Sequence, residues 1–172
     1  MSLPGLLLLA VGGGAALAAL SSLSGVGRSE TGAEAFIANG RSMVGWEYYL
    51  GAGLAENPTR PSPPYTDCGK FISDALRLTG ISGIPRTITA QVEMAPVKRN
   101  IQGLTRAQVL GQLKPGECVA FKWSTGGFPG RAYDHGGIYA GDGKLLHASS
   151  SKGGVVEANF PQSGWKTVYT WF

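Results

Sequence analysis

Two different spacings of apolar residues divide the chain, a helical spacing in its first two thirds and a strand-like spacing in its last third. After Asp67, apolar side chains recur every three to four residues, which predicts an amphipathic helix. The residues of this stripe are Phe71, Ile72, Ala75, Leu76 and Leu78. Asp67, or Thr66 before it, is the predicted N-cap, and Gly80 is a suitable stop. Similar patterns predict helices over 32–46 and 103–113.

The last third of the chain predicts strands. Five short segments separated by glycine-containing turns carry this prediction: "CVAFKW", "HGGIYAG", "KLLHAS", "GGVVEANF" and "KTVYTWF". The turn "GDGK" is typical of a hairpin. Because the helices come first and the strands follow one another through short turns, the predicted fold class is α+β, with an antiparallel meander.

The N-terminal 27 residues form a separate unit by composition. Residues 1–27 carry no charged side chain, and "LPGLLLLAVGGGAALAAL" is apolar for 18 residues, near the shortest length that spans a bilayer as a helix. A secretory signal shares such a run but normally begins with positive charge, which is missing here. We expect residues 1–27 to be a membrane anchor, a signal or an assembly arm, and residues 28–172 to form one domain. The domain begins with a polar linker over 28–32, in which a helix starts at Ser29 or Thr31.

The hydrophobic fraction and the net charge of the chain exclude some classes of protein and partner. Of 172 residues, 43% are hydrophobic, which excludes a disordered chain. The net charge of +4 suits an anionic partner such as a bacterial wall. The basic residues are scattered, so we expect no nucleic-acid partner.

The chain has two cysteines, and their settings differ. Cys118 lies in the apolar strand segment "ECVAF", which is typical of a small buried hydrophobic residue. Cys68 stands at the start of the predicted helix, where a thiol can react. A disulfide between them is the alternative.

Both histidines lie in one predicted hairpin, His135 on its first strand and His147 on its second. A thiol at a helix N-terminus beside an imidazolium has a lowered pKa, so Cys68 is a candidate nucleophile with His135 as its base and His147 as the group that orients the base. Two alternatives stay open: half-buried histidines without a catalytic role, and a zinc site, although no CxxC or HxxxH spacing supports a metal.

Five segments in unchanged order resemble the NlpC/P60 family of cysteine peptidases, papain-like hydrolases of the bacterial cell wall. They are "GWEYYLGAG", "YTDCGKFISDALRLTGI", "IPRT", "LKPGECVAF" and "HGGIYAGDGKLLHASSSKGGVV". Together they cover most of the domain, from Gly45 to Val156. The resemblance implies a papain-like α+β fold in which a helical part carrying the nucleophile packs on an antiparallel sheet.

The resemblance also implies roles for individual residues. Cys68 takes the place of the nucleophile, His135 that of the general base, and His147 that of the third polar residue. The family's thiol chemistry requires neither a metal nor an organic cofactor.

Three further residues match the family's pattern. Tyr48 takes the place of a tyrosine near the thiolate that holds substrate or the oxyanion. Asp67 matches the residue before the nucleophile, where we favour a helix cap over direct chemistry. Arg86 matches the arginine of the P-R-T segment, with a structural role or a substrate contact as alternatives. The family's Ser-Gly after the cysteine is Gly69-Lys70 here, which places a cation near the thiolate and puts substrate preference in doubt.

The resemblance implies hydrolysis of a peptide amide in peptidoglycan, through an acyl-enzyme on Cys68, in the cell envelope or on a virion. One alternative is a structural component of an envelope complex or phage tail, held through residues 1–27, with hydrolysis secondary or lost. Another is an acyltransferase on a related fold.

Overall fold

The computed structural model describes residues 27–52, 65–123 and 130–172 of the chain. Residues 1–26, and with them nearly all of the expected anchor, signal or arm, lie outside the described residues, as does most of the proline-rich loop before Tyr65. Within the described ranges, no helix is both long enough and apolar enough to cross a membrane.

Helices occupy the first part of the chain, as the pattern predicts. They are α1 (Gly27–Ser42), α2 (Cys68–Leu78), α3 (Ile88–Met94) and α4 (Arg106–Leu110). The linker expected over 28–32 is helical, and the helix start expected at Ser29 or Thr31 is a few residues late, because α1 begins at Gly27. Arginine and glutamate are good helix formers, so the helix continues beyond the apolar stripe that signalled it. The pattern did not predict α3.

In the described residues, eight strands form one sheet. They are β1 (Glu47–Tyr48), β2 (Tyr65–Thr66), β3 (Val97–Asn100), β4 (Cys118–Phe121), β5 (His135–Gly141), β6 (Lys144–Ser149), β7 (Gly154–Asn159) and β8 (Trp165–Thr170). Their order across the sheet is β2-β1-β7-β6-β5-β4-β8-β3, and every pair is antiparallel except β1 with β2. The class is α+β, as predicted.

The meander holds from β4 to β7 and then breaks. β8 pairs with β4 and β3, at the far side of the meander from β7. In a simple meander, β8 would pair with the free edge of β7. Here β1 pairs with that edge instead: Glu47 pairs with Gly154, and the Val155 amide donates to the Trp46 carbonyl at 2.8 Å. The expectation of an uninterrupted meander is therefore wrong at its last strand.

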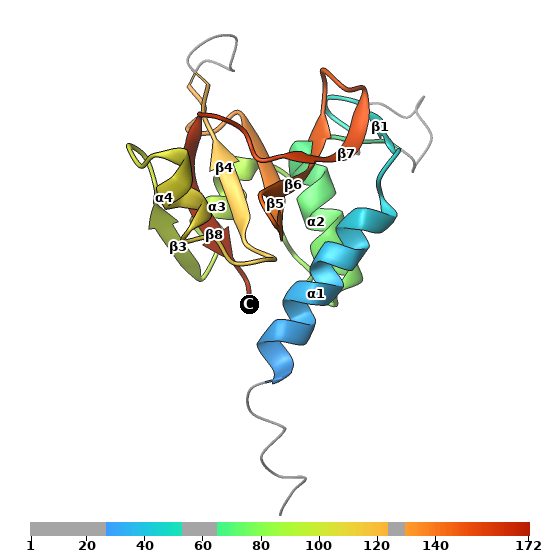
Figure 1. The fold of residues 1–172 in the computed structure, drawn as a ribbon. Coiled ribbons are helices and arrows are strands. Elements are labelled where there is room, and N and C mark those ends of the chain that lie inside the picture. The colour runs from blue at the N-terminus through green and yellow to red at the C-terminus, as the bar shows by residue number, and fades with distance from the viewer. Residues whose placement is uncertain (1–26, 53–64, 124–129) are drawn as a thin grey trace, which may run out of the picture.

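Both faces of the sheet are covered. Figure 1 shows α1 and α2 side by side against the strands. The apolar side chains of these two helices form a hydrophobic core with one face of the sheet. This core includes Phe36, Phe71, Ile72, Leu76, Ile138, Leu146 and Tyr169. A second core on the other face includes Ile101, Val109, Phe121, Leu145, Phe160, Trp165 and Val168. Because β4 lies between both cores, all four of its residues are buried.

A glycine at the start of β5 lets the helices approach the sheet closely. A Cβ added at Gly136 would lie 2.5 Å from Ile88 Cδ1 and 3.2 Å from Ile72 Cδ1, below normal contact distance. The missing side chain therefore allows α2 and α3 to pack directly beside His135.

Candidate active site

Cys68 is the first residue of α2, as the sequence predicts. Asp67 is its N-cap, with extended backbone angles and a side chain whose Oδ1 accepts from the Lys70 amide at 2.9 Å. A capping carboxylate satisfies a donor that the first helical turn leaves unpaired. The buried stripe of α2 then anchors the helix, so that its N-terminus, with the thiol, points at the start of β5.

The Asp67 carboxylate is nearly buried and fully engaged in holding the backbone. Its Oδ2 accepts from the Gly51 amide at 3.1 Å and pairs with the guanidinium of Arg86. One carboxylate thus joins the helix start, the segment after β1 and the segment before α3. These contacts agree with the cap role that the sequence favoured, and they place Arg86 in a structural ion pair.

The thiol of Cys68 is half-buried and lies against the backbone. It contacts the amide of Gly136, the residue after His135, which brings the nucleophile to the strand that carries the predicted base. No hydrogen bond joins Cys68 to His135 in the described part of the chain, and such bonds are often long in ligand-free sites.

The two histidines are directly hydrogen-bonded. His135 Nε2 and His147 Nδ1 lie 2.8 Å apart, and the rings meet edge to face with an interplanar angle of 86°. With its Nε2 engaged, His135 has Nδ1 left for a proton from the thiol. A bond of this kind fixes the orientation of the ring, as expected of an orienting residue.

Aromatic side chains pack against His135 from the side away from α2. Trp123 and Phe121 stack on each other with centroids 5.3 Å apart, and their rings lie 5.3 Å and 6.1 Å from that of His135. Burial, followed by the neighbouring His147, lowers the pKa of His135 to about 3. Burial also lowers the pKa of His147. Both imidazoles are therefore neutral at neutral pH.

The expected lowering of the thiol pKa is wrong. Burial, and then the negative charge of Asp67, raise the pKa of Cys68 to about 11, and the nearby backbone amides offset only part of this. The resting site therefore holds a neutral thiol beside a neutral imidazole. Sequence shows the helix N-terminus but not the burial, which has the larger effect.

Lys70 does not supply the cation that the sequence suggested. Its Nζ forms an ion pair with Asp74, one helical turn along α2. It is not among the groups that shift the pKa of Cys68. The i,i+4 spacing directs the lysine along the helix and away from the thiol.

A cavity of about 410 Å³ opens over the thiol. It is lined by Tyr48, Leu50, Gly51, Asp67, Cys68, Gly69, Arg86, Thr87, Ile88, Thr89, Arg131, Tyr133 and Asp134. Tyr48, Asp67 and Arg86, each predicted from sequence, thus lie around Cys68. Burial, then the charges of Cys68 and Asp67, raise the pKa of Tyr48 to about 12, so its hydroxyl stays a hydrogen-bond donor.

Several residues of the site were not predicted. Arg131, Tyr133 and Asp134 line the cavity, and Trp123 packs on the base. Their proximity to His135 in sequence is the one signal that could have found them. Gln91, which bonds to the backbone next to Cys68, lies far from it in sequence and carries no such signal.

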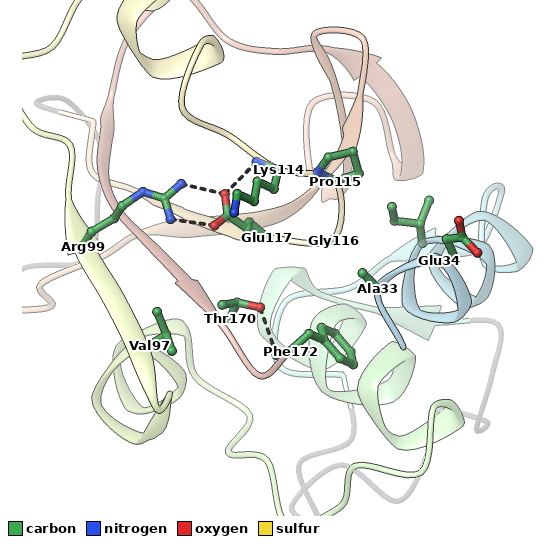
Figure 2. Close-up of a pocket in the computed structure, with 11 residues that line it drawn as sticks. Ala33, Glu34, Val97, Arg99, Lys114, Pro115, Gly116, Glu117, Thr170 and Phe172 are labelled. Carbon is green, nitrogen blue, oxygen red and sulfur yellow. Dashed lines mark hydrogen bonds and ion pairs between the residues drawn. The ribbon is translucent and has the colours of Figure 1, made fainter. Parts of the chain in front are cut away.

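A second cavity, of about 660 Å³, lies away from the thiol, between α1, β3 and the end of β8 (Figure 2). The charged pair at its wall is Arg99 with Glu117, joined by two bonds of 2.6 Å. No cysteine or histidine is among its lining residues. The described residues of this cavity therefore offer neither a thiol nor an imidazole, and the candidate active site is the one at Cys68.

The zinc alternative has no geometric basis in the described ranges. Within residues 27–52, 65–123 and 130–172, no three side chains of histidine, cysteine, aspartate or glutamate are grouped to hold a metal ion. Both cysteines are free thiols, so the disulfide alternative is wrong. Cys118 is fully buried in β4, as expected.

Comparison with known proteins gives one family. Residues 45–172 match the sequence model of the NlpC/P60 family. A curated relative, gamma-DL-glutamyl hydrolase of Bacillus subtilis (strain 168), is 23% identical over 146 residues, which cover 84% of this chain and 30% of the relative. The chain thus spans less than a third of that protein.

Solved structures share the fold. The peptidoglycan hydrolase RipB of Mycobacterium tuberculosis is 23% identical, with a TM-score of 0.60 over 83% of this chain and 65% of that one. RipD of the same organism, described as a non-catalytic NlpC/p60 domain protein adapted to peptidoglycan binding, is 17% identical, with a TM-score of 0.58 over 82% of this chain and 98% of that one. At these identities the likeness shows the fold and leaves the activity open.

Proposed function

Because the chain belongs to the NlpC/P60 family, we propose that it is a cysteine hydrolase that cleaves peptide amide bonds in bacterial peptidoglycan. One observation carries the proposal. The Cys68 thiol, at the start of α2, meets the strand on which His135 is hydrogen-bonded to His147 at 2.8 Å. A nucleophile, a base and an orienting group in this arrangement can form and hydrolyse an acyl-enzyme.

The reaction begins from neutral partners. As Sγ of Cys68 bonds to the substrate carbonyl carbon, its proton passes to Nδ1 of His135. This transfer requires the tautomer in which His135 Nε2–H donates to His147 Nδ1, 2.8 Å away. The imidazolium then gives the proton to the amide nitrogen as the C–N bond breaks. Water attacks the thioester with His135 as base, and the thiol regains its proton as the acid leaves.

Two groups can donate a hydrogen bond to the carbonyl oxygen as it gains charge in the proposed reaction. The backbone N–H of Cys68 lies at the N-terminus of α2, where a helix favours negative charge. Tyr48 lines the same cavity with a protonated hydroxyl. We assign the oxyanion to the Cys68 amide, with Tyr48 in support.

The names of the relatives suggest where to look for the substrate. RipB is a peptidoglycan hydrolase and the Bacillus relative hydrolyses gamma-glutamyl bonds, as their names state. We therefore propose a stem-peptide bond at a glutamyl residue as the first bond to test. Such a substrate would place the protein in the cell envelope.

The test is mass spectrometry of purified muropeptides after incubation with wild type, Cys68→Ala and Cys118→Ala. We expect free carboxylate products from wild type and Cys118→Ala and none from Cys68→Ala. Products joined to an acceptor amine or alcohol would instead establish the acyltransferase alternative. Intact muropeptides in all three reactions would contradict the proposal.

A second function, binding without hydrolysis, is favoured by one observation. The raised pKa of Cys68, about 11, leaves little thiolate at neutral pH, and the similar RipD is described as non-catalytic and adapted to peptidoglycan binding. Sedimentation with insoluble peptidoglycan separates the two functions. A pure binding protein would pellet with the wall and release no fragments.

A further inference from the structure

Gln91 lies behind the nucleophile, and its side-chain amide connects three separate parts of the chain. The side chain is fully buried in α3. Nε2 donates to the carbonyls of Gly69 and Pro85, both at 2.8 Å, and Oε1 accepts from the Tyr169 hydroxyl at 3.2 Å. A carboxamide has two N–H donors, so both are used on backbone acceptors.

The peptide unit between Gly69 and Lys70 is held at both ends. Its carbonyl accepts from Gln91, and its N–H donates to Asp67 Oδ1 at 2.9 Å. Because a peptide unit is planar, these two bonds fix its orientation. The backbone immediately after Cys68 is therefore held from two sides, by the N-cap side chain of its own helix and by a side chain of α3.

The segment before α3 is held against the same helical turn. Arg86 pairs with Asp67, and the Pro85 carbonyl is bonded to Gln91. A Cβ added at Gly69 would lie 1.8 Å from the Arg86 carbonyl oxygen, so the two backbones are in direct contact. Asp67 and Gly69, the two neighbours of Cys68, thus both contact the segment before α3. Gln91 bonds to both sides of this contact, at Gly69 and at Pro85.

From this geometry we propose that Gln91 is a positioning residue for the nucleophile, acting through the carbonyls of Gly69 and Pro85 to fix the thiol and the backbone N–H of Cys68. The inference rests on the proposed function, since the reaction is what requires this placement. Misplacing a reacting group by about 1 Å costs on the order of 10²-fold in rate. Gln91 does not itself line the cavity and reaches it only through the backbone carbonyl of Gly69, so its loss should affect turnover more than substrate affinity.

The matched variants are Gln91→Leu and Tyr169→Phe. The first removes both donors to the clamped carbonyls. The second keeps these donors and removes the Tyr169 hydroxyl, which bonds to Gln91 Oε1 and also to Cys118. We expect kcat to fall about 10- to 100-fold in Gln91→Leu, with KM within about twofold of wild type. Tyr169→Phe should keep kcat within about threefold. If Gln91→Leu does not fold, Gln91→Met has a similar length and no donor, and should show the same loss.

A measurement without substrate separates this inference from the proposed function. The rate of Cys68 alkylation by iodoacetamide is followed against pH in Cys118→Ala versions of wild type and both variants. We expect the profile of Gln91→Leu to move toward lower pH, because a released turn admits water to the thiol, and that of Tyr169→Phe to match wild type. Equal profiles in all three proteins would overturn the positioning role, even if wild type hydrolyses peptidoglycan. A shift confined to Gln91→Leu would support it even if no hydrolysis is found.

Discussion

Nε2 of His135 lies 2.8 Å from Nδ1 of His147, and the two rings meet nearly at right angles. The bond defines different tasks for the two residues. In the proposed mechanism, His135 has one nitrogen left for the thiol proton, and His147 holds the ring that carries it. The histidines are therefore not equivalent in any catalytic test.

His135→Ala should approach the inactivity of Cys68→Ala, because general-base catalysis contributes roughly 10²–10⁴-fold. His147→Ala should lose less, and His147→Asn or His147→Gln should recover part of the loss, since an amide can still bond to an imidazole nitrogen. Turnover of a wall peptide by these variants, with zinc content measured alongside, is the test. Full activity in His135→Ala would end the catalytic assignment, and stoichiometric zinc in wild type would favour a metal site.

The two thiols should react at very different rates with iodoacetamide. Cys68 borders the open cavity, whereas Cys118 is fully buried and burial raises its pKa well above the usual value. Because the pKa of Cys68 is about 11, its alkylation should be slow at neutral pH and accelerate up to that value. Peptide mapping after timed alkylation gives both rates. Equal labelling of the two cysteines in the folded protein would contradict the assignment.

The folding stability should decrease as the pH is lowered from about 6.5 to 4.5. The pKa of His135 is about 3 in the folded state, against 6.5 for an ordinary histidine, and that of His147 is also lowered. Stability from these groups is complete above pH 6.5 and is lost as pH falls toward the folded pKa, because the unfolded chain binds protons that the native state rejects.

The two histidines are the only ones in the chain, so the double variant His135→Gln/His147→Gln isolates their effect. Urea midpoints measured from pH 7.5 to 4.5 should decline in wild type and stay nearly constant in the double variant. The same decline in both proteins would assign the acid sensitivity to other groups.

Gly69→Ala should be destabilising, although alanine normally favours a helix over glycine. A Cβ at this position would lie 1.8 Å from the Arg86 carbonyl oxygen, so the helix start and its partner segment must separate. We expect a loss of about 1–3 kcal/mol in the free energy of unfolding, together with loss of turnover. Gly111→Ala is the control, since its added Cβ would meet nothing closer than 3.3 Å. Equal stability of the two variants in urea would show that the contact at Gly69 is easily relieved.

Removing residues 1–26 should leave a folded, soluble and monomeric domain. Phe36 and Ile37 of α1 are buried in the core, as is Met43 directly after it, so the deletion must stop before α1. We propose that the removed residues hold the full chain at a membrane or in an assembly, because an exposed apolar run of this length promotes aggregation in water. Circular dichroism and light scattering of both forms, with vesicle flotation of the full chain, test this. An unfolded truncated form would place the segment in the core.

Sequence by itself determined the elements that local pattern specifies. The apolar stripe and the cap at Asp67 define α2, and the short apolar segments between glycine turns define β4 to β8. The order of the five family-like segments was sufficient to indicate the family. These signals are readable because helix caps, apolar periodicity and tight turns depend on residues a few positions apart.

Only the tertiary structure decided what depends on contacts between distant segments. The pairing of β8 with β4, the ion pair of Arg86 with Asp67 and the contact of Gln91 with Gly69 join residues that no local pattern connects. The protonation state of Cys68 likewise depends on burial by distant segments. A helix N-terminus alone would lower the pKa of Cys68, but the packing that removes water from the thiol raises it to about 11. Desolvation is set by every segment that covers a group, and it therefore appears only when the chain is folded.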